Sequence, residues 1–545
     1  MDGGGPLGSL GVAPSTLVTS VFLILLVYAI VVDVTHSVKR IPTVRLFDLA
    51  TEPGKWPLSC FNAALKWFRD LDPMLRLSAP FGLRTFVLIS DAAALEHVLV
   101  KHASSYGKRH AHGVLERFRT TKLPVAGVEA WPIVHRLTAQ LAGDLGRDVQ
   151  FAARLVALVR SVVSTAMPLR PPSPPTSITH ARTRDGDGDS DNVMVTELSD
   201  PIREVWWCVV LLVVLGIDDP KSAALYAEAW SACIDRLDTP AVFLFRIAQL
   251  WPSARNRNYW RGCAALRALV RRHVDAALHD PETVPKWCAL HRLCCSPSRS
   301  GGSAHSVAPS DAVEILLELC FTGASSVTTT MIWALHHLAQ PEATDVQRAV
   351  QGQARAAFAA ALGRGEKEEG PRPLTLGAVG EGVPALDSVL RETLRLYSPI
   401  HIGRVALEDD HVPCRGTVHH LPRGTDVAAN YWFLHRDPSY WPRADEFVPS
   451  RWDGVAPNAH GAHYGPFSKG MRGCPGQRVA FVLMKAALAT ILGERELRAS
   501  MPSDGCPHPR FKQSVVLPNQ PEHVHVRYSR VAEEVVPAPE REAAA

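Results

Sequence analysis

The chain has 545 residues, 46% of them hydrophobic, and a formal net charge of +4 at pH 7. This length and apolar content suffice for a large folded core. The small charge, with no basic run interleaved with aromatic residues, argues against a nucleic-acid-binding protein. The eleven cysteines show no framework spacing, which argues against a disulfide-stapled secreted protein and indicates reduced thiols facing the cytosol.

The N-terminal segment predicts a membrane anchor. Residues 17–32 are almost entirely apolar, and extension upstream to Leu10 reaches the ~20 residues that cross a bilayer. Lys39 and Arg40 follow, so the positive-inside rule puts the C-terminal side in the cytosol. A cleaved signal peptide is the competing interpretation, but it needs a basic start and this chain begins MDGGG. We therefore expect an uncleaved single-pass anchor in the endoplasmic-reticulum membrane.

The remaining chain divides into expected ordered and disordered parts. The anchor segment covers residues 1–39, with the membrane span at about 10–32. We expect a linker at residues 40–56, a folded domain at 57–531 and a disordered tail at 532–545. Low apolar content predicts disordered or flexible insertions at residues 171–192, 296–309 and 363–384. A short strand is predicted at 86–89, and helices are predicted at 92–100, at 205–215 in the core and at 241–251, where the helix is very apolar.

Residues 311–340 predict one long helix that ends before Pro341. Gly323 weakens this helix locally. Ser325, Ser326 and the neighbouring threonines can hydrogen-bond back to helix carbonyls and bend it. We therefore expect a bend near Gly323.

Residues 386–397 predict another helix, on which Glu392 and Arg395 lie three apart and can pair. Such a pair is common on solvated helices and is weak evidence by itself. Here it is followed by a particular order of motifs: Pro399, Arg404, the turn at 421–424, and the segment Phe447-Val448-Pro449-Ser450-Arg451-Trp452.

Residues 467–476 match the pattern F-x-x-G-x-R-x-C-x-G and run into an apolar helix predicted at 477–492. With Pro475 at the first helical position, the helix dipole points at Cys474 and stabilises a thiolate, which a soft metal centre requires. Gly470 and Gly476 permit tight turns near the sulfur. A buried free cysteine in a glycine-rich loop is the alternative, which the full spaced pattern disfavours.

These segments, in this order, resemble the cytochrome P450 family over roughly residues 60–530. The resemblance implies a mainly α fold: a large helical haem-thiolate domain with a small β-sheet region, plus one N-terminal transmembrane helix. It implies haem b (iron protoporphyrin IX) as cofactor, with Cys474 as the axial ligand of the iron. The other loop residues that it assigns to haem binding are Phe467, Gly470, Arg472 and Gly476.

Two departures from the family pattern bear on the site. After Gly323 the family has an acid and then a threonine, where this chain has Ser325 and Ser326. The resemblance makes these three residues the oxygen-side catalytic group, with no carboxyl to relay protons. The family's W-x-x-x-R motif reads here as Trp131 followed by His135 and Arg136, and either of the last two could bind a haem propionate. Arg404 and Arg472 are further propionate candidates.

The resemblance also assigns a charged structural triad, Glu392, Arg395 and Arg451. It implies a monooxygenase that inserts one oxygen atom into a lipophilic substrate, a sterol or a fatty acid. Electrons would come from NADPH-cytochrome P450 reductase, with cytochrome b5 as an optional second donor. A basic docking face is expected from Lys469, Arg478 and Lys485. Two alternatives stay open: a haem-thiolate isomerase or peroxide-using enzyme that needs no reductase, and a non-catalytic haem protein.

Overall fold

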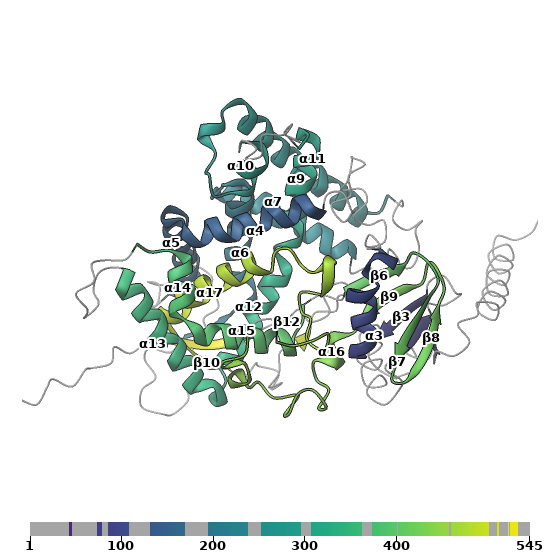
Figure 1. Ribbon diagram of the computed structural model, residues 1–545. Coiled ribbons are helices and arrows are strands. Elements are labelled where there is room, and N and C mark those ends of the chain that lie inside the picture. Colours follow the sequence, from purple (N-terminus) through teal and green to yellow (C-terminus); the bar gives the residue numbers. More distant parts are fainter. Residues whose placement is uncertain are drawn as a thin grey trace, which may run out of the picture. The chain divides into compact units, whose positions relative to one another are not determined.

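The computed structural model describes residues 43–45, 74–78, 85–107, 131–168, 194–237, 252–295, 307–361, 373–399, 402–456, 459–500, 510–511, 521–522 and 524–531. Contacts divide the chain into two compact units. We call residues 1–109 with 402–434 the β-rich unit, and residues 110–401 with 435–545 the helical unit. Each is described by itself (Figure 1). The expected anchor, the insertion at 171–192, the helix at 241–251 and the tail lie outside the described residues.

The β-rich unit contains a six-stranded mixed sheet with the strand order β1-β2-β3-β9-β6-β4. Its parallel pairs are β1 with β2 and β3 with β9, and its other neighbours are antiparallel. The strands are β1 (Thr43–Arg45), β2 (Met74–Ser78), β3 (Thr85–Ile89), β9 (Asp426–Ala429), β6 (Ile402–Ala406) and β4 (Tyr106–Gly107). Strand β1 lies inside the stretch that was expected to be a linker.

Helix α3 (Ala92–Glu96) follows β3 and widens into a single π-helical turn, His97–Lys101, before a 3₁₀ turn at Ala103–Ser105. The predicted strand and helix are therefore confirmed, with a change of helix type that the sequence did not indicate. A β-hairpin of β7 (Asp410–Cys414) and β8 (Thr417–Leu421) lies beside α3 (Figure 1). The short helix α16 (Tyr431–Leu434) completes the unit.

The helical unit confirms the predicted mainly α fold. Three small strands, β10 (Arg495–Ala499), β13 (His525–Arg530) and β5 (Met194–Glu197), form one sheet, and β11 (Arg510–Phe511) pairs with β12 (Pro521–Glu522). The helices are α4 (Trp131–Arg147), α5 (Val149–Ala166), α6 (Ser199–Leu215), α7 (Pro220–Leu237), α9 (Ala254–His279), α10 (Ala289–Cys294), α11 (Pro309–Thr322), α12 (Ser325–Leu338), α13 (Thr344–Ala361), α14 (Leu376–Gly382), α15 (Pro384–Leu396) and α17 (Gln477–Glu494).

Helix α14 lies within residues 363–384, where the sequence predicted only a flexible loop, so that prediction is wrong for 376–382. The helix begins because Thr375 caps it: its hydroxyl accepts a hydrogen bond from the Ala378 N–H at 3.1 Å. Leu376 and Val379 are buried and anchor this short helix to the core. Two apolar anchors in a glycine-rich stretch gave too weak a periodic signal to predict a helix.

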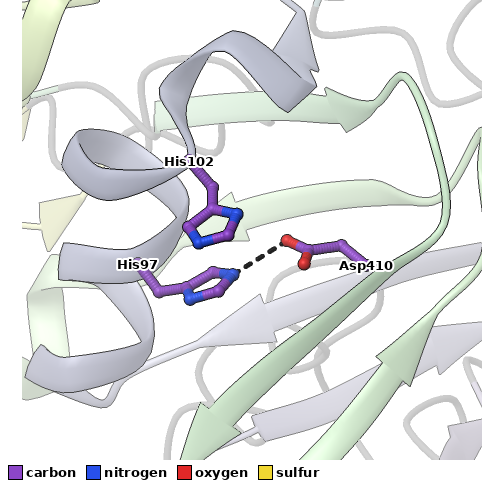
Figure 2. Close-up of side chains that lie close together, drawn as sticks. All are labelled: His97, His102 and Asp410. Carbon is purple, nitrogen blue, oxygen red and sulfur yellow. Dashed lines mark hydrogen bonds and ion pairs between the residues drawn. The ribbon is translucent and has the colours of Figure 1, made fainter.

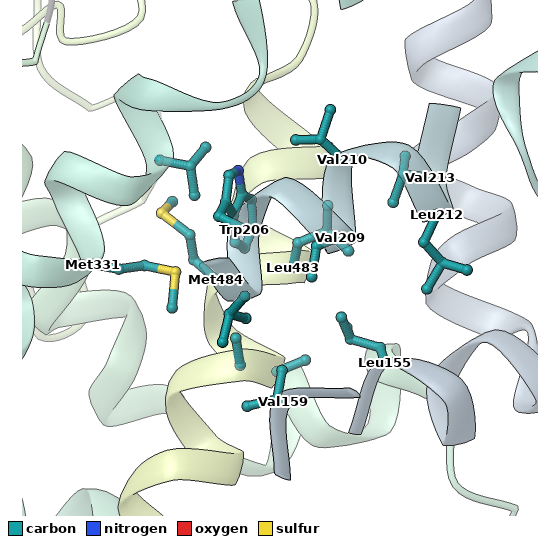
Figure 3. Packing of buried hydrophobic residues seen from close by; sticks show 14 of the residues in the cluster. Leu155, Val159, Trp206, Val209, Val210, Leu212, Val213, Met331, Leu483 and Met484 are labelled. Carbon is teal, nitrogen blue, oxygen red and sulfur yellow. The ribbon is translucent and has the colours of Figure 1, made fainter. Parts of the chain in front are cut away.

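Helix α6 lies in the centre of the core. Nine of the eleven residues of its apolar run Val205–Leu215 are buried, all but Trp207 and Cys208, as predicted for a core helix. Figure 3 shows Trp206, Val209 and Leu212 of α6 among Leu155 of α5 and Met484 of α17. This packing holds α6 and α17 in fixed positions, and both helices support the site described below.

Within the described ranges, two helical stretches are long and apolar enough to cross a membrane, Val149–Ala166 and Pro309–Leu338. Two-thirds of the apolar window in the second stretch is buried against other helices of the unit. Buried core helices commonly have such compositions.

Candidate functional site

The Cys474 loop, residues 467–476, is closed by its own backbone. The Cys474 N–H donates to the Phe467 carbonyl at 2.7 Å, and the Gly473 N–H donates to the Gly470 carbonyl at 3.0 Å. Gly470 has a φ of +70°, a conformation that glycine adopts without strain. The loop leaves the Cys474 side chain exposed. The Phe467 ring anchors the loop to α17, where its centroid lies 5.8 Å from that of Phe481.

Helix α17 begins at Gln477, with Gly476 as its N-cap residue. The prediction that Pro475 is the first helical residue is therefore wrong by two positions. Pro475 instead lies in the turn before the helix, and the Ala480 N–H donates to the Gly476 carbonyl at 2.9 Å. Cys474 still lies just ahead of a helix N-terminus, where the partial positive charge favours a thiolate. A Cβ on Gly476 would touch the Cys474 sulfur at 3.8 Å, so glycine keeps that side of the sulfur open.

Trp131 joins the start of α4 to this loop. Its indole N–H donates to the Met471 carbonyl at 2.9 Å, and the Arg472 guanidinium lies 5.7 Å from the indole ring centroid. The His135 ring meets the same indole edge-on, with centroids 4.9 Å apart. The predicted residues Trp131, His135 and Arg472 are thus brought together around the Cys474 loop.

His135 and Arg136 differ in their surroundings. The His135 Nε2 atom is buried and has no hydrogen-bond partner among the described residues, whereas Arg136 is exposed. An unsatisfied buried nitrogen is costly unless a ligand completes it. Arg404 belongs to the β-rich unit, where it is buried on β6 and donates to the Gly403 carbonyl at 2.8 Å.

The predicted triad is an ion cluster around a completely buried carboxylate. Glu392 and Arg395 are both 0% exposed. Arg395 donates from Nε and Nη2 to the Glu392 carboxylate at 2.9 and 2.8 Å, and Arg451 Nε donates at 3.0 Å. The Trp452 indole and the Val448 N–H each add a hydrogen bond to Glu392 at 2.9 Å. Five donors thus surround one carboxylate, which compensates for its desolvation.

The remaining N–H groups of Arg395 donate hydrogen bonds to backbone carbonyls. The acceptors are the carbonyl oxygens of His435, Ala444 and Glu446, at 2.6, 2.6 and 2.9 Å. The pair therefore fixes α15 to the irregular segment that precedes the Cys474 loop. Its role in this geometry is to hold backbone in place.

His435 is a supporting residue that the sequence analysis missed. It is completely buried, and its Nε2 accepts from the Gly465 N–H at 3.2 Å, so Nδ1 carries the proton and donates to the Arg395 carbonyl at 2.9 Å. Burial, followed by the charges of Arg395 and Arg436, holds the pKa of His435 well below its ordinary value. A neutral histidine thus links α15 to the chain that enters the Cys474 loop.

The predicted long helix is two helices. It begins at Pro309 and is interrupted at Gly323 and Ala324, between α11 and α12. The Trp206 indole N–H donates to the Gly323 carbonyl at 2.7 Å, which satisfies an acceptor at the break. A Cβ on Gly323 would lie 3.0 Å from the Leu319 carbonyl oxygen, so the close turn favours glycine. The predicted single continuous helix is therefore wrong, and the interruption lies at Gly323, where the sequence predicted a local weakening.

Hydroxyl groups cluster around this break. The Ser326 hydroxyl is 3.5 Å from the Thr322 carbonyl, a long and weak hydrogen bond. Ser325 is 8% exposed, and Thr328 and Thr330 bond back to the carbonyls of Ala324 and Ser326 at 2.9 Å. The Ser326 hydroxyl is therefore less firmly engaged than its neighbours, so it can rotate to donate elsewhere.

Comparison with known proteins bears on this arrangement. A sequence model of the family described as cytochrome P450 matches residues 192–526. The relatives include cytochrome P450 4d2 of Drosophila melanogaster, which is 35% identical over 36% of this chain and 36% of that protein. They also include lanosterol 14-alpha demethylase of Eremothecium gossypii, 26% identical over 56% of each protein. The chain thus aligns with about a third to just over half of the length of these curated relatives.

Solved structures show the same fold. The crystal structure of the cytochrome P450DA heme domain superposes with a TM-score of 0.65, at 18% identity, over 90% of this chain and 97% of that one. A zebra fish cytochrome P450 solved with abiraterone superposes with a TM-score of 0.61, at 19% identity, over 86% and 98% of the two chains.

The residues at the site fit haem. Cys474 offers an exposed sulfur at a helix N-terminus, while the unsatisfied His135 nitrogen and the Arg472 guanidinium lie around the same loop, suited to an anionic group. The family match covers more than half of the sequence, and the structural neighbours share the fold. This chain belongs to the cytochrome P450 family, whose cofactor is haem held by a cysteine thiolate.

Proposed function

We propose that this chain is a monooxygenase that inserts one oxygen atom from dioxygen into a lipophilic substrate. The observation that carries the proposal is the exposed Cys474 sulfur, in a backbone-closed loop at the N-terminus of α17. When bound, the haem supplies dioxygen activation, and the thiolate favours cleavage of the O–O bond.

The other site residues orient the cofactor and keep its ligand loop in place. Phe467, Gly470 and Gly476 shape the loop around Cys474, which would hold the haem iron. Arg472 and the unsatisfied Nε2 of His135 would bind the propionates, with Trp131 positioning both side chains. The burial of His135 Nε2 favours it over the exposed Arg136. Arg404 stays a further candidate because of its place in the sequence motif.

Ser326 is the proposed proton donor on the oxygen side. Its hydroxyl is held only weakly by the Thr322 carbonyl, and the break at Gly323 opens the helix beside it. Ser325 stands where the family has an acid, and a hydroxyl cannot store and release a proton as a carboxyl does. Proton delivery therefore runs from water through Ser326 Oγ, with Ser325 holding that water.

The proposed electron donor is NADPH-cytochrome P450 reductase, with cytochrome b5 as an optional second donor. The expected basic face is smaller than the sequence implied. Lys485 is only 16% exposed and lies 3.6 Å from Asp387, and Lys469 donates to the His460 carbonyl at 3.0 Å. Arg478 is exposed and is the one of the three that we propose for docking an acidic partner.

The substrate class that we favour is a sterol or a fatty acid. Two relatives, lanosterol 14-alpha demethylase and human mitochondrial 25-hydroxyvitamin D-1 alpha hydroxylase, are named for sterol-related substrates. An apolar N-terminal stretch of about 20 residues supports an anchor in the endoplasmic-reticulum membrane with the catalytic domain on the cytosolic side. Lipophilic substrates would then enter from the bilayer.

A second candidate is a haem-thiolate enzyme that uses hydroperoxides and needs no reductase. Ser325 favours it, because a peroxide substrate already carries the reduced O–O bond and needs less proton delivery than dioxygen does. No acid occupies the position next to Ser326.

The deciding experiment compares two electron sources. The detergent-purified, haem-loaded protein is first titrated with sterols and fatty acids, and the spin-state change of the haem spectrum identifies binders. Product formation is then measured with reductase and NADPH, and separately with hydroperoxide alone. Turnover that requires NADPH and reductase supports the monooxygenase. Turnover with hydroperoxide, together with no turnover with NADPH and reductase, contradicts it and supports the second candidate.

The role of Ser326 is tested in the same assay. We expect Ser326→Ala to lower the amount of product formed per NADPH consumed, because less efficient proton delivery would release reduced oxygen as hydrogen peroxide. The control is Ser161→Ala, the same change on the exposed face of α5. Equal coupling in the two variants would contradict a proton-donating role for Ser326.

A further inference from the structure

Three metal-binding side chains converge in the β-rich unit. His97 belongs to the π-helical turn after α3, His102 follows that turn, and Asp410 begins β7. One ligand atom from each of the three lies within 4.8 Å of the others. Figure 2 shows the two imidazole rings one above the other, with the Asp410 carboxylate facing the edge of His97.

The π-helical turn explains why the two histidines meet. Residues five apart on an α-helix lie about 140° apart around its axis, so they face different directions. The wider π turn lets the His102 N–H donate to the His97 carbonyl at 2.8 Å. The rings consequently stack, with centroids 3.9 Å apart and planes 14° from parallel. Such single π turns occur frequently at functional sites.

Both oxygens of the Asp410 carboxylate take part in hydrogen bonds that fix its orientation. Asp410 Oδ2 lies 2.9 Å from His97 Nε2 and accepts from the Tyr106 hydroxyl at 2.6 Å. Asp410 Oδ1 accepts from the His411 N–H at 2.7 Å. Metal-binding carboxylates are commonly oriented by hydrogen bonds of this kind.

We infer that His97, His102 and Asp410 form a binding site for a divalent transition metal, with Zn²⁺ the ion that the ligands suit best. Two imidazoles and one carboxylate are a usual zinc ligand set, with the remaining position left for water. Ligand atoms of a tetrahedral zinc site are about 3.3 Å apart, so the His97–Asp410 contact opens by only a few tenths of an ångström. His102 is exposed and turns to aim its nitrogen at the ion.

The metal would join two segments that are distant in the sequence. His97 and Asp410 are 313 positions apart, so one ion fastens the π turn to the β7–β8 hairpin. The site is separate from the haem ligand set, since none of its residues belongs to the Cys474 loop. The inference therefore stands whether or not the proposed monooxygenase activity is found.

The test is calorimetric titration of chelator-treated, haem-loaded full chain with Zn²⁺ alone. We expect one ion per chain, and binding at least about tenfold weaker in His102→Ala and in Asp410→Asn. His102→Asp, which keeps a ligand atom, should retain more affinity than His102→Ala. Melting curves without zinc establish that each variant folds. Added Zn²⁺ should raise the midpoint of the wild type but not that of His102→Ala or Asp410→Asn.

The matched control is the double variant His411→Ala/His420→Ala. These two histidines are cross-strand neighbours on the same hairpin, with ring centroids 5.0 Å apart, and could themselves attract zinc. The inference requires that this variant bind Zn²⁺ like the wild type. Loss of binding in this variant, or equal binding by wild type, His102→Ala and Asp410→Asn, would overturn it.

Discussion

Glu392 and Cys474 are the two most informative side chains of the helical unit, and their surroundings are opposite. Glu392 is 0% exposed and accepts five hydrogen bonds from three side chains and one backbone N–H. Cys474 is exposed, in a loop whose backbone bonds close on themselves. The first residue is satisfied by the protein, whereas the second is presented to a ligand.

The comparison distinguishes a residue that stabilises the fold from a residue that binds the cofactor. A buried carboxylate tolerates no loss of its partners, because an uncompensated charge in the interior is very costly. Cys474 is exposed, so replacing its side chain removes little buried surface and should affect folding little. Substitution of Glu392 should therefore mainly lower the stability of the fold, whereas substitution of Cys474 should mainly change cofactor binding.

The largest effect on stability is expected from Glu392→Gln. The change leaves Arg395 as a buried, unpaired charge and should destabilise the fold by ~3–5 kcal/mol. Chemical denaturation of the haem-loaded protein measures this. The control is Asp387→Asn, which weakens the partly exposed ion pairs with Arg391 and Lys485 and should cost ~1 kcal/mol. Similar losses in the two variants would contradict the central role of Glu392.

A smaller effect is expected from Trp206→Phe. Phenylalanine keeps most of the apolar packing but leaves the Gly323 carbonyl without its indole donor, which should cost ~1–3 kcal/mol. The same variant should alter the substrate-induced spin shift, because the carbonyl sits at the break between α11 and α12. A variant as stable as the wild type, with an unchanged spin shift, would show that the indole does not maintain the break.

The buried His435 predicts a loss of stability in acid. Its pKa is depressed in the folded state, so below the ordinary histidine pKa of about 6.5 the unfolded chain binds a proton that the folded chain does not. The free energy of unfolding should fall by up to about 1.4 kcal/mol for each pH unit in that range. Denaturation from pH 7.5 to 5 measures the slope, which should be shallower in His435→Gln. An unchanged slope in that variant would exclude His435 as its source.

The smallest expected effect separates His135 from Arg136. His135→Ala removes the buried nitrogen beside Trp131 and should weaken haem retention by about tenfold. Arg136→Ala changes an exposed side chain and should leave retention unaltered. Haem transfer to an acceptor protein measures both rates. The reverse ranking would assign the propionate to Arg136.

Local spacing made part of the site predictable. Glu392 and Arg395 are three apart on one helix, so their pairing follows from helix geometry, and Cys474 stands in a motif with five defined positions. The donors from Trp452, Val448 and Arg451 reach Glu392 only through tertiary folding. The order of motifs predicted that Arg451 contacts Glu392. Trp452 adjoins Arg451 in the same segment, and this position could have suggested a contact for Trp452 as well.

Long-range contacts account for what the sequence could not predict. At the helix interruption, the Gly323 carbonyl accepts its hydrogen bond from the indole of Trp206, which lies 117 positions away in the sequence. The His97, His102 and Asp410 cluster was missed because His97 and His102 meet only on a π turn, and because Asp410 is remote in the sequence. The apolar helix predicted from Gln477 does begin there, but Pro475 lies in the turn before it, because proline suits a turn as well as a first helical position.

The central claim is that Cys474 holds the haem iron as a thiolate. The direct test is the absorption spectrum of the ferrous carbon monoxide complex in wild type, in Cys474→Ser, and in Cys295→Ser as a matched control outside the loop. We expect a thiolate-type Soret band in the wild type and in Cys295→Ser, and its loss in Cys474→Ser while the apoprotein keeps its unfolding midpoint. A thiolate-type band that persists in Cys474→Ser would contradict the ligand assignment and the function proposed from it.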